Sequence, residues 1–110
     1  MNPDSIKQLS QAILSFRDAR DWEQFHTSKN LVAALNVESA ELLELFLWSN
    51  KPRKPEEVTS EVADVFSYLL LFCETNNIDL GQALLDKLAK NEQKYPVEKS
   101  KGNAIKYTDL

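Results

Sequence analysis

The sequence is poor in glycine, cysteine and histidine, and each shortage narrows the class of protein. It contains two glycines and four prolines in 110 residues, and the prolines stand outside the long periodic segments. That distribution is typical of a helical chain. The single cysteine, Cys73, excludes an intramolecular disulfide and a thiolate zinc site. Its place in an apolar run favours a small buried hydrophobic residue.

The chain also lacks a long apolar run and a basic patch. No stretch reaches the roughly 18 apolar residues of a membrane span, and residues 1–4 do not begin a signal peptide. We therefore expect a cytoplasmic location and no membrane contact. The formal net charge is −4, and no basic cluster offers the footprint of a nucleic-acid binder. We expect no nucleic-acid partner.

Apolar residues at helical spacing predict four helices and no strand. We expect these helices over about residues 5–20, 28–48, 55–75 and 79–94. Ser5 and Asp79 are each followed three residues later by a glutamine, a capping-box pattern, and Thr27 or Ser28 can cap the second helix. Pro55 suits the first position of the third helix. The sequence thus predicts an all-α fold, a four-helix bundle-like subunit.

Two acidic pairs stand on consecutive predicted helices. Glu38 and Glu41 belong to the second helix, and Glu61 and Asp64 belong to the third. Residues three apart share one face of a helix, so each pair can present two carboxylates to one point. The chain between the pairs is long enough to turn and return antiparallel, which would bring the pairs face to face.

The position of Glu38 favours a metal site over a solvated surface. It continues the stripe of Leu35 and Leu42, and an unpaired charge beside a core is costly. Converging carboxylates repel one another, and a divalent cation resolves that conflict. Oxygen ligands alone favour Mg²⁺, with Mn²⁺ possible, over zinc. Spacing alone leaves the surface interpretation open, but the single histidine, His26, excludes a di-iron site with two Glu-x-x-His motifs.

The sequence resembles the MazG-like all-alpha nucleotide pyrophosphohydrolases, and within them the dCTP pyrophosphatase group. The shared signature is E-x-x-E followed by E-x-x-D, which is read here as Glu38, Glu41, Glu61 and Asp64. Further similar segments cover nearly the whole chain: Arg20-Asp21-Trp22-Glu23-Gln24-Phe25-His26, Lys29-Asn30-Leu31, residues 44–48, Asn91 with Lys94-Tyr95-Pro96-Val97, and Lys106-Tyr107-Thr108-Asp109-Leu110.

The resemblance implies Mg²⁺-dependent cleavage of a (deoxy)nucleoside triphosphate to the monophosphate and pyrophosphate. It implies dCTP or a modified dCTP as substrate, and a homo-oligomer, a dimer or tetramer. Residues 1–96 would form the MazG-like domain, and residues 97–110 a tail that packs on the oligomer or near the site. The four acids would be metal-binding and catalytic. The expected substrate-binding residues are Trp22, His26, Lys29, Trp48, Tyr68, Asn91, Lys94 and Tyr95.

Two other functions stay open from the sequence. The chain can be a non-catalytic helical oligomer that binds a nucleotide or a partner, although such a protein would be expected to have lost one of the acids. Alternatively, the same chemistry can act on another base, such as that of dUTP. Pocket shape decides the base, and a sequence does not give pocket shape.

Overall fold

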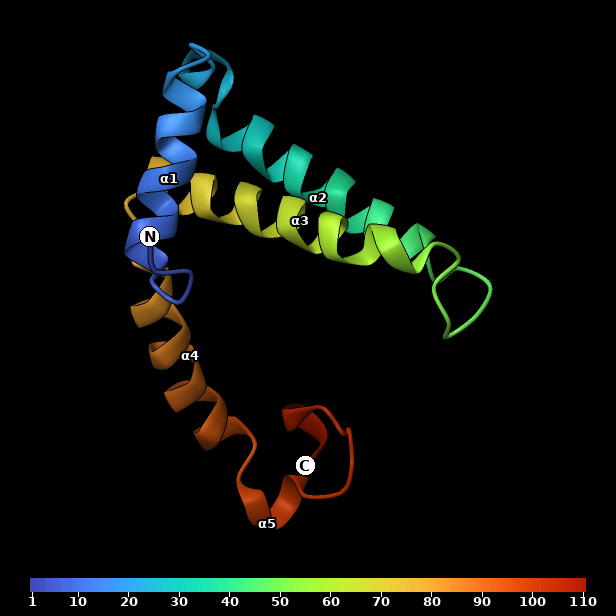
Figure 1. Cartoon of the computed structure of the whole chain (residues 1–110). Helices are drawn as coiled ribbons and strands as arrows, with labels where there is room; N and C mark the ends of the chain where they lie inside the picture. The colour runs from blue at the N-terminus through green and yellow to red at the C-terminus, as the bar shows by residue number, and fades with distance from the viewer. The chain divides into compact units, whose positions relative to one another are not determined.

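The computed structural model describes all of residues 1–110 and is entirely helical (Figure 1). The predicted all-α class is confirmed. The α-helices are α1 (Ile6–Asp18), α2 (Ser28–Glu44), α3 (Pro55–Thr75), α4 (Leu80–Lys94) and the short α5 (Val97–Ser100). Two 3-10 turns, η1 (Glu23–Phe25) and η2 (Tyr107–Asp109), lie in the connections.

The chain divides into two compact units, Met1–Ile78 and Asp79–Leu110. In the first unit, α2 and α3 run side by side along most of their length, and α1 packs against α3 (Figure 1). The second unit contains α4, α5 and η2. The predicted boundary between residues 1–96 and 97–110 separates the family domain from a tail, and it does not describe compact units. That boundary stays a prediction.

The predicted helix starts are confirmed by their side-chain caps. Each cap satisfies a backbone N–H that the first turn of a helix cannot pair internally. For α2 the sequence left two candidates, and the structure selects Thr27. The three bonds run from Gln8 N to Ser5 Oγ (3.2 Å), from Asn30 N to Thr27 Oγ1 (3.1 Å) and from Gln82 N to Asp79 Oδ1 (3.0 Å).

The helix ends differ more from the prediction than the starts. The second helix was expected to reach residue 48, but α2 ends at Glu44. Beyond it, the amides of Leu45 and Phe46 bond to carbonyls three residues back rather than four, which tightens the last turn. The first helix ends at Asp18 rather than at residue 20. The tail, which had no clear periodicity, forms α5 and η2.

The buried core belongs to the first unit. It consists of Leu31, Leu45, Leu70, Leu71 and Cys73, so the prediction of a buried Cys73 is confirmed. Leu70, Leu71 and Cys73 all come from the C-terminal half of α3, and their burial anchors that half of the helix. None of the helices is both long enough and apolar enough to cross a membrane.

Candidate functional site

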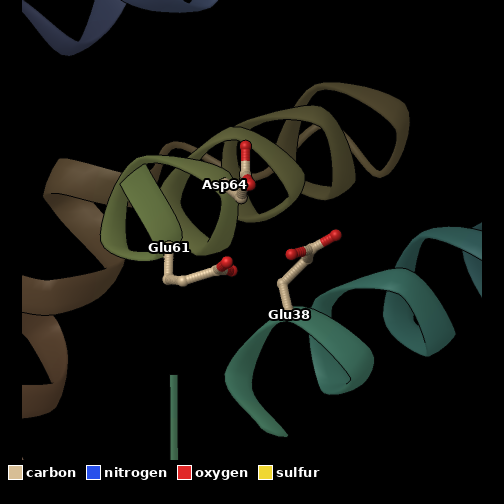
Figure 2. A group of neighbouring side chains, drawn as sticks. All are labelled: Glu38, Glu61 and Asp64. Carbon is tan, nitrogen blue, oxygen red and sulfur yellow. The ribbon is translucent and has the colours of Figure 1, made fainter. Parts of the chain in front are cut away.

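Three of the four predicted metal ligands converge between α2 and α3. Glu38 extends from α2 toward Glu61 and Asp64 on α3 (Figure 2). One carboxylate oxygen from each of the three lies within 4.8 Å of the others. The three-residue spacing puts Glu61 and Asp64 on one face of α3, and the pairing of α2 with α3 brings Glu38 to the same point.

Two oxygens of this acidic cluster are buried without a hydrogen-bond partner. They are Oε2 of Glu38 and Oε2 of Glu61. A buried carboxylate oxygen without a donor loses its hydration and gains nothing in return. A divalent cation between the three carboxylates would supply the missing partner, so the residues fit a metal ion. The donor set contains only oxygen, which suits Mg²⁺ or Mn²⁺.

The electrostatics of the cluster agree with this geometry. Burial, followed by the neighbouring carboxylates Glu41, Asp64 and Glu61, raises the pKa of Glu38 to about 7 from 4.5. Burial and the same kind of repulsion also raise the pKa of Glu61. Without a cation, the site therefore retains a proton on its acids at a pH where isolated glutamates are ionised.

Glu41, the fourth predicted ligand, stands at the edge of the cluster. Its carboxylate is not among the three that lie within 4.8 Å of one another, and its side chain is exposed. It nevertheless lies close enough to raise the pKa of both Glu38 and Glu61. Glu38, Glu61 and Asp64 are therefore the inner candidate ligands, and the role of Glu41 as a ligand stays a prediction.

A cavity of about 320 Å³ adjoins the acidic cluster and shares Asp64 with it. Three predicted substrate-binding residues, Trp22, His26 and Tyr68, lie on its wall. The structure thus brings together three of the residues that the sequence predicts to bind the substrate. The remaining lining residues were not predicted from the sequence: Ile13, Phe16, Arg17, Ser67 and Leu71.

The turn between α1 and α2 builds one wall of this cavity. The Trp22 amide donates to the Arg17 carbonyl (3.2 Å), which folds the connection back onto the end of α1. The Trp22 ring then meets the Phe16 ring edge to face, with centroids 5.9 Å apart. The Arg20 guanidinium lies 3.6 Å from the Phe16 ring centroid and donates to the Phe16 carbonyl. These contacts fix the aromatic wall.

The helix α3 forms the opposite wall and gives the cavity its direction. Asp64, Tyr68 and Leu71 follow one another along one side of α3 and all line the cavity. At 1.5 Å per residue, Asp64 and Leu71 are separated by roughly 10 Å along the axis. The cavity thus extends from the acidic cluster at Asp64 toward the C-terminal end of α3.

His26 contributes an unsatisfied polar atom to this region. Its Nδ1 is buried and has no hydrogen-bond partner. Burial, and then the positive charge of Arg17, lower its pKa below 6.5. The imidazole is therefore neutral at pH 7, and it can serve a bound molecule as a donor or an acceptor without adding charge.

The other predicted substrate-binding residues do not line the cavity. Lys29 is exposed in the first turn of α2, and Trp48 follows α2 with 90% of its surface exposed. Asn91, Lys94 and Tyr95 belong to the second unit. There the Lys94 ammonium lies 4.7 Å from the Tyr107 ring centroid. For these five residues a role in binding stays a prediction.

Most of the additional cavity residues lie at helical spacings that are visible in the sequence. Ile13 and Phe16 belong to the apolar stripe of α1, which by itself predicts packing in a core rather than a role in binding. Ser67 and Leu71 follow Asp64 by roughly one and two helical turns, at spacings that share its face. Arg17 had no such signal, because an arginine in the last turn of a helix is ordinarily a solvated cation near the negative end of the dipole.

Comparison with known proteins places the chain in a family. The sequence model of the MazG-like family matches residues 33–110. The chain is 37% identical to dCTP pyrophosphatase 1 of Mus musculus and 36% identical to that of Rattus norvegicus, in each case over 96% of this chain and 68% of the relative. A pyrophosphatase of known structure from Archaeoglobus fulgidus is 38% identical and superimposes with a TM-score of 0.78, over 87% of this chain and 96% of that one. The chain belongs to the MazG-like family.

Proposed function

We propose that the protein hydrolyses a nucleoside triphosphate to the monophosphate and pyrophosphate with the help of Mg²⁺, and that its substrate is dCTP or a modified dCTP. One observation carries the proposal: a cluster of unsatisfied carboxylates opens onto an aromatic cavity, and Asp64 belongs to both. A nucleotide has the matching two ends, an anionic phosphate chain and a flat base.

The arrangement of α3 supports a division of the substrate between the two parts of the site. The acidic cluster lies at Asp64, and the aromatic cavity extends for roughly 10 Å along the helix beyond it. That length is comparable to a nucleoside. The base would stack among Trp22, Tyr68 and Phe16, while the triphosphate would lie at Glu38, Glu61 and Asp64.

The residues of the cluster fit the task of cleaving the triphosphate. Glu38, Glu61 and Asp64 would hold a divalent cation, and Glu41 would complete the set. Such an ion supplies charge neutralisation for the phosphates and lowers the pKa of a bound water. Through the cation, the carboxylates would orient the triphosphate so that water attacks the α-phosphorus, the bond to the α–β bridging oxygen breaks, and pyrophosphate leaves. The aromatic wall would hold the base and exclude water from the cavity.

The names of the relatives support cytosine as the base. The mouse and rat proteins are dCTP pyrophosphatases, and this chain matches each of them over 96% of its length. A cavity of about 320 Å³ accommodates a pyrimidine with room beside it, which agrees with a substituted cytosine. The same reaction on dUTP is the alternative that requires the least change in the site.

We further propose that the protein acts as a homo-oligomer, a dimer or tetramer. In the first unit, α2 and the residues after it leave large apolar side chains exposed, among them Val37, Leu43, Leu47 and Trp48. Burying them would stabilise an assembly. Lys29, Asn91, Lys94 and Tyr95 would then bind the phosphate chain within this assembly. The tail of residues 97–110 would pack on the oligomer or near the site.

One assay tests the proposed reaction. The purified protein is incubated with each of dCTP, 5-methyl-dCTP, dUTP and dATP, with Mg²⁺ or with EDTA, and the products are separated chromatographically. We expect dCMP and pyrophosphate from dCTP, and no turnover in EDTA. Release of inorganic phosphate with dCDP would refute cleavage at the α-phosphate. Tight binding of dCTP without products would favour the non-catalytic alternative.

A further inference from the structure

Arg17 is a nearly buried cation on the wall of the aromatic cavity, and no step of the proposed reaction involves it. Its side chain is 11% exposed, although arginines in the last turn of a helix ordinarily extend into solvent. It lines the cavity together with Trp22, His26 and Tyr68. A buried guanidinium needs acceptors for its five N–H groups, so its surroundings show what it can bind.

Only part of the Arg17 guanidinium is satisfied by the protein. Nε donates to Asp18 Oδ1 at 2.8 Å, and Nη2 contacts the same oxygen at 2.8 Å. Nη2 also lies 3.5 Å from Glu23 Oε2. The carboxylates of Asp18 and Glu23 thus contact Nε and Nη2 of the Arg17 guanidinium. Nη1 has no hydrogen bond to the protein and is not among the buried polar atoms that lack a partner. Its donors are therefore accessible to water and can be taken up by a bound molecule.

Arg17 stands at the end of the cavity that is remote from the acidic cluster. A second cavity, of about 350 Å³, is lined by Glu74 and Thr75 at the C-terminal end of α3. Arg17 and His26 line both cavities. Both residues therefore lie toward the C-terminal end of α3, whereas Asp64 lies near the middle of this helix. If the phosphates lie at the acidic cluster, the outer edge of a base in the cavity would face this end.

We propose that Arg17 is a base-selecting residue, which donates a hydrogen bond from its guanidinium to a carbonyl oxygen on the edge of the base. This inference rests on the proposed function, because it assigns the base to the cavity. Cytosine and uracil carry such an oxygen at position 2, whereas adenine carries none. The site would thus accept keto pyrimidines and reject adenine, since adenine would displace water from the guanidinium without supplying an acceptor in its place.

The surroundings of Arg17 support a role in reading the base. The neutral His26 imidazole beside it leaves Arg17 as the only cationic side chain on the cavity wall. The Ser67 hydroxyl already donates a hydrogen bond to the Ala63 carbonyl (2.8 Å). Among the polar groups of the cavity, the guanidinium is therefore the strongest uncommitted donor for a neutral carbonyl acceptor.

The test compares two substrates that differ in this one acceptor. In 2-thio-dCTP, sulfur replaces the 2-oxygen and accepts hydrogen bonds poorly. We expect the wild-type protein to prefer dCTP over 2-thio-dCTP in kcat/KM by about 10- to 100-fold, as for a hydrogen bond to a charged group. In R17M, which keeps the length of the side chain, this preference should fall to within about twofold of unity. An unchanged preference in R17M would overturn the proposal.

Further variants separate base selection from a structural role. R17K keeps the charge but loses the planar fork, and we expect an intermediate preference. E23Q removes the negative charge of the carboxylate that lies 3.5 Å from Nη2, and the preference should stay as in the wild type. Equal losses for dCTP, 2-thio-dCTP and dATP in R17M, with an unchanged ratio, would show a merely structural contribution. Circular dichroism and thermal unfolding check that each variant folds.

A binding measurement keeps this inference distinguishable from the proposed reaction. Calorimetric titration with dCMP and with dAMP needs no turnover. If the protein cleaves no triphosphate yet binds dCMP more tightly than dAMP, and R17M removes the difference, the reaction is refuted while the role of Arg17 stands. If the wild-type protein cleaves dCTP and R17M leaves the selectivity intact in both assays, the role of Arg17 is refuted alone.

Discussion

Glu38 and Asp64, on different helices, bring a carboxylate oxygen of each within 4.8 Å of the other. No lysine or arginine forms an ion pair with either carboxylate, because the ion pairs of the chain involve other acids. Two like charges at that distance in a partly buried site destabilise the fold. A divalent cation held by the oxygens of this pair, as proposed above, would remove the repulsion.

Removal of one carboxylate of the acidic cluster should separate activity from stability. For Glu38→Gln, we expect kcat/KM for dCTP to fall by at least about 100-fold, because even partners outside the ligand shell cost about 10- to 100-fold. The melting temperature of the metal-free protein should rise, because the substitution removes repulsion. Glu56→Gln, in the exposed first turn of α3, is the matched control. A variant at Glu38 with wild-type activity would exclude this residue as a ligand.

The raised pKa of Glu38 predicts how stability depends on pH in the metal-free protein. In the unfolded chain this group titrates near 4.5, but in the fold its pKa is about 7. Between these values the folded state holds the extra proton, so the free energy of unfolding falls as pH rises. Below pH 4.5 the contribution is fully present, and above pH 7 it is lost.

Comparison with a variant isolates this contribution from that of His26. The lowered pKa of His26 acts in the opposite sense, because the unfolded chain then binds the proton more tightly and stability rises with pH up to about 6.5. Urea unfolding of the wild type and of Glu38→Gln from pH 4 to pH 8 should therefore show a difference that changes mainly between pH 4.5 and 7. A difference that is independent of pH would contradict the assignment.

Metal binding should stabilise the fold by mass action. If Mg²⁺ binds only the folded protein, 100 times its dissociation constant adds about 2.7 kcal/mol to the free energy of unfolding. We expect the melting temperature to rise with the logarithm of the Mg²⁺ concentration, and the rise to disappear in Glu61→Gln. Glu56→Gln, which leaves the acidic cluster intact, is the control. With Mg²⁺ or Ca²⁺ at equal ionic strength, its melting temperature should rise as in the wild type. A shift of equal size in Glu61→Gln would indicate general screening instead.

Local patterns predicted much of the fold, whereas contacts made by the connections escaped prediction. Ser5, Thr27 and Asp79 begin their helices as expected, because a cap depends on residues only a few positions away. The acidic pairs could also be located, since the spacing of Glu61 and Asp64 fixes a shared face. That Glu38 belongs to the inner group and Glu41 to its edge depends on how α2 is rotated against α3, and spacing alone does not give that rotation.

Arg17 shows why part of the cavity could not be found from the sequence. Its burial results from the fold of the connection, in which the Trp22 amide bonds back to the Arg17 carbonyl, and from the carboxylates of Asp18 and Glu23. Asp21, at φ 54°, sits in the left-handed region where the chain turns out of α1. A turn of this kind leaves no periodic pattern, so a cation beside it looks solvated.

The two tryptophans should respond differently to substitution. Trp22 lines the cavity, whereas Trp48 is 90% exposed after α2. Loss of a stacking ring costs about 1–3 kcal/mol per base by analogy with single-strand binders, so W22A should weaken the binding of dCMP by that amount. Because Trp48 does not line the cavity of its own chain, W48A should act through the assembly, with a loss of oligomer in light-scattering measurements.

Fluorescence distinguishes these roles directly. In a W48F variant, Trp22 is the remaining tryptophan, and dCMP should quench its emission as the base stacks on the ring. In a W22F variant, the emission of Trp48 should instead shift with protein concentration, because association removes its indole from water. Quenching of Trp48 by dCMP at a concentration where the protein is fully assembled would place this residue at the base, as the sequence predicted, and would require a neighbouring subunit to complete the pocket.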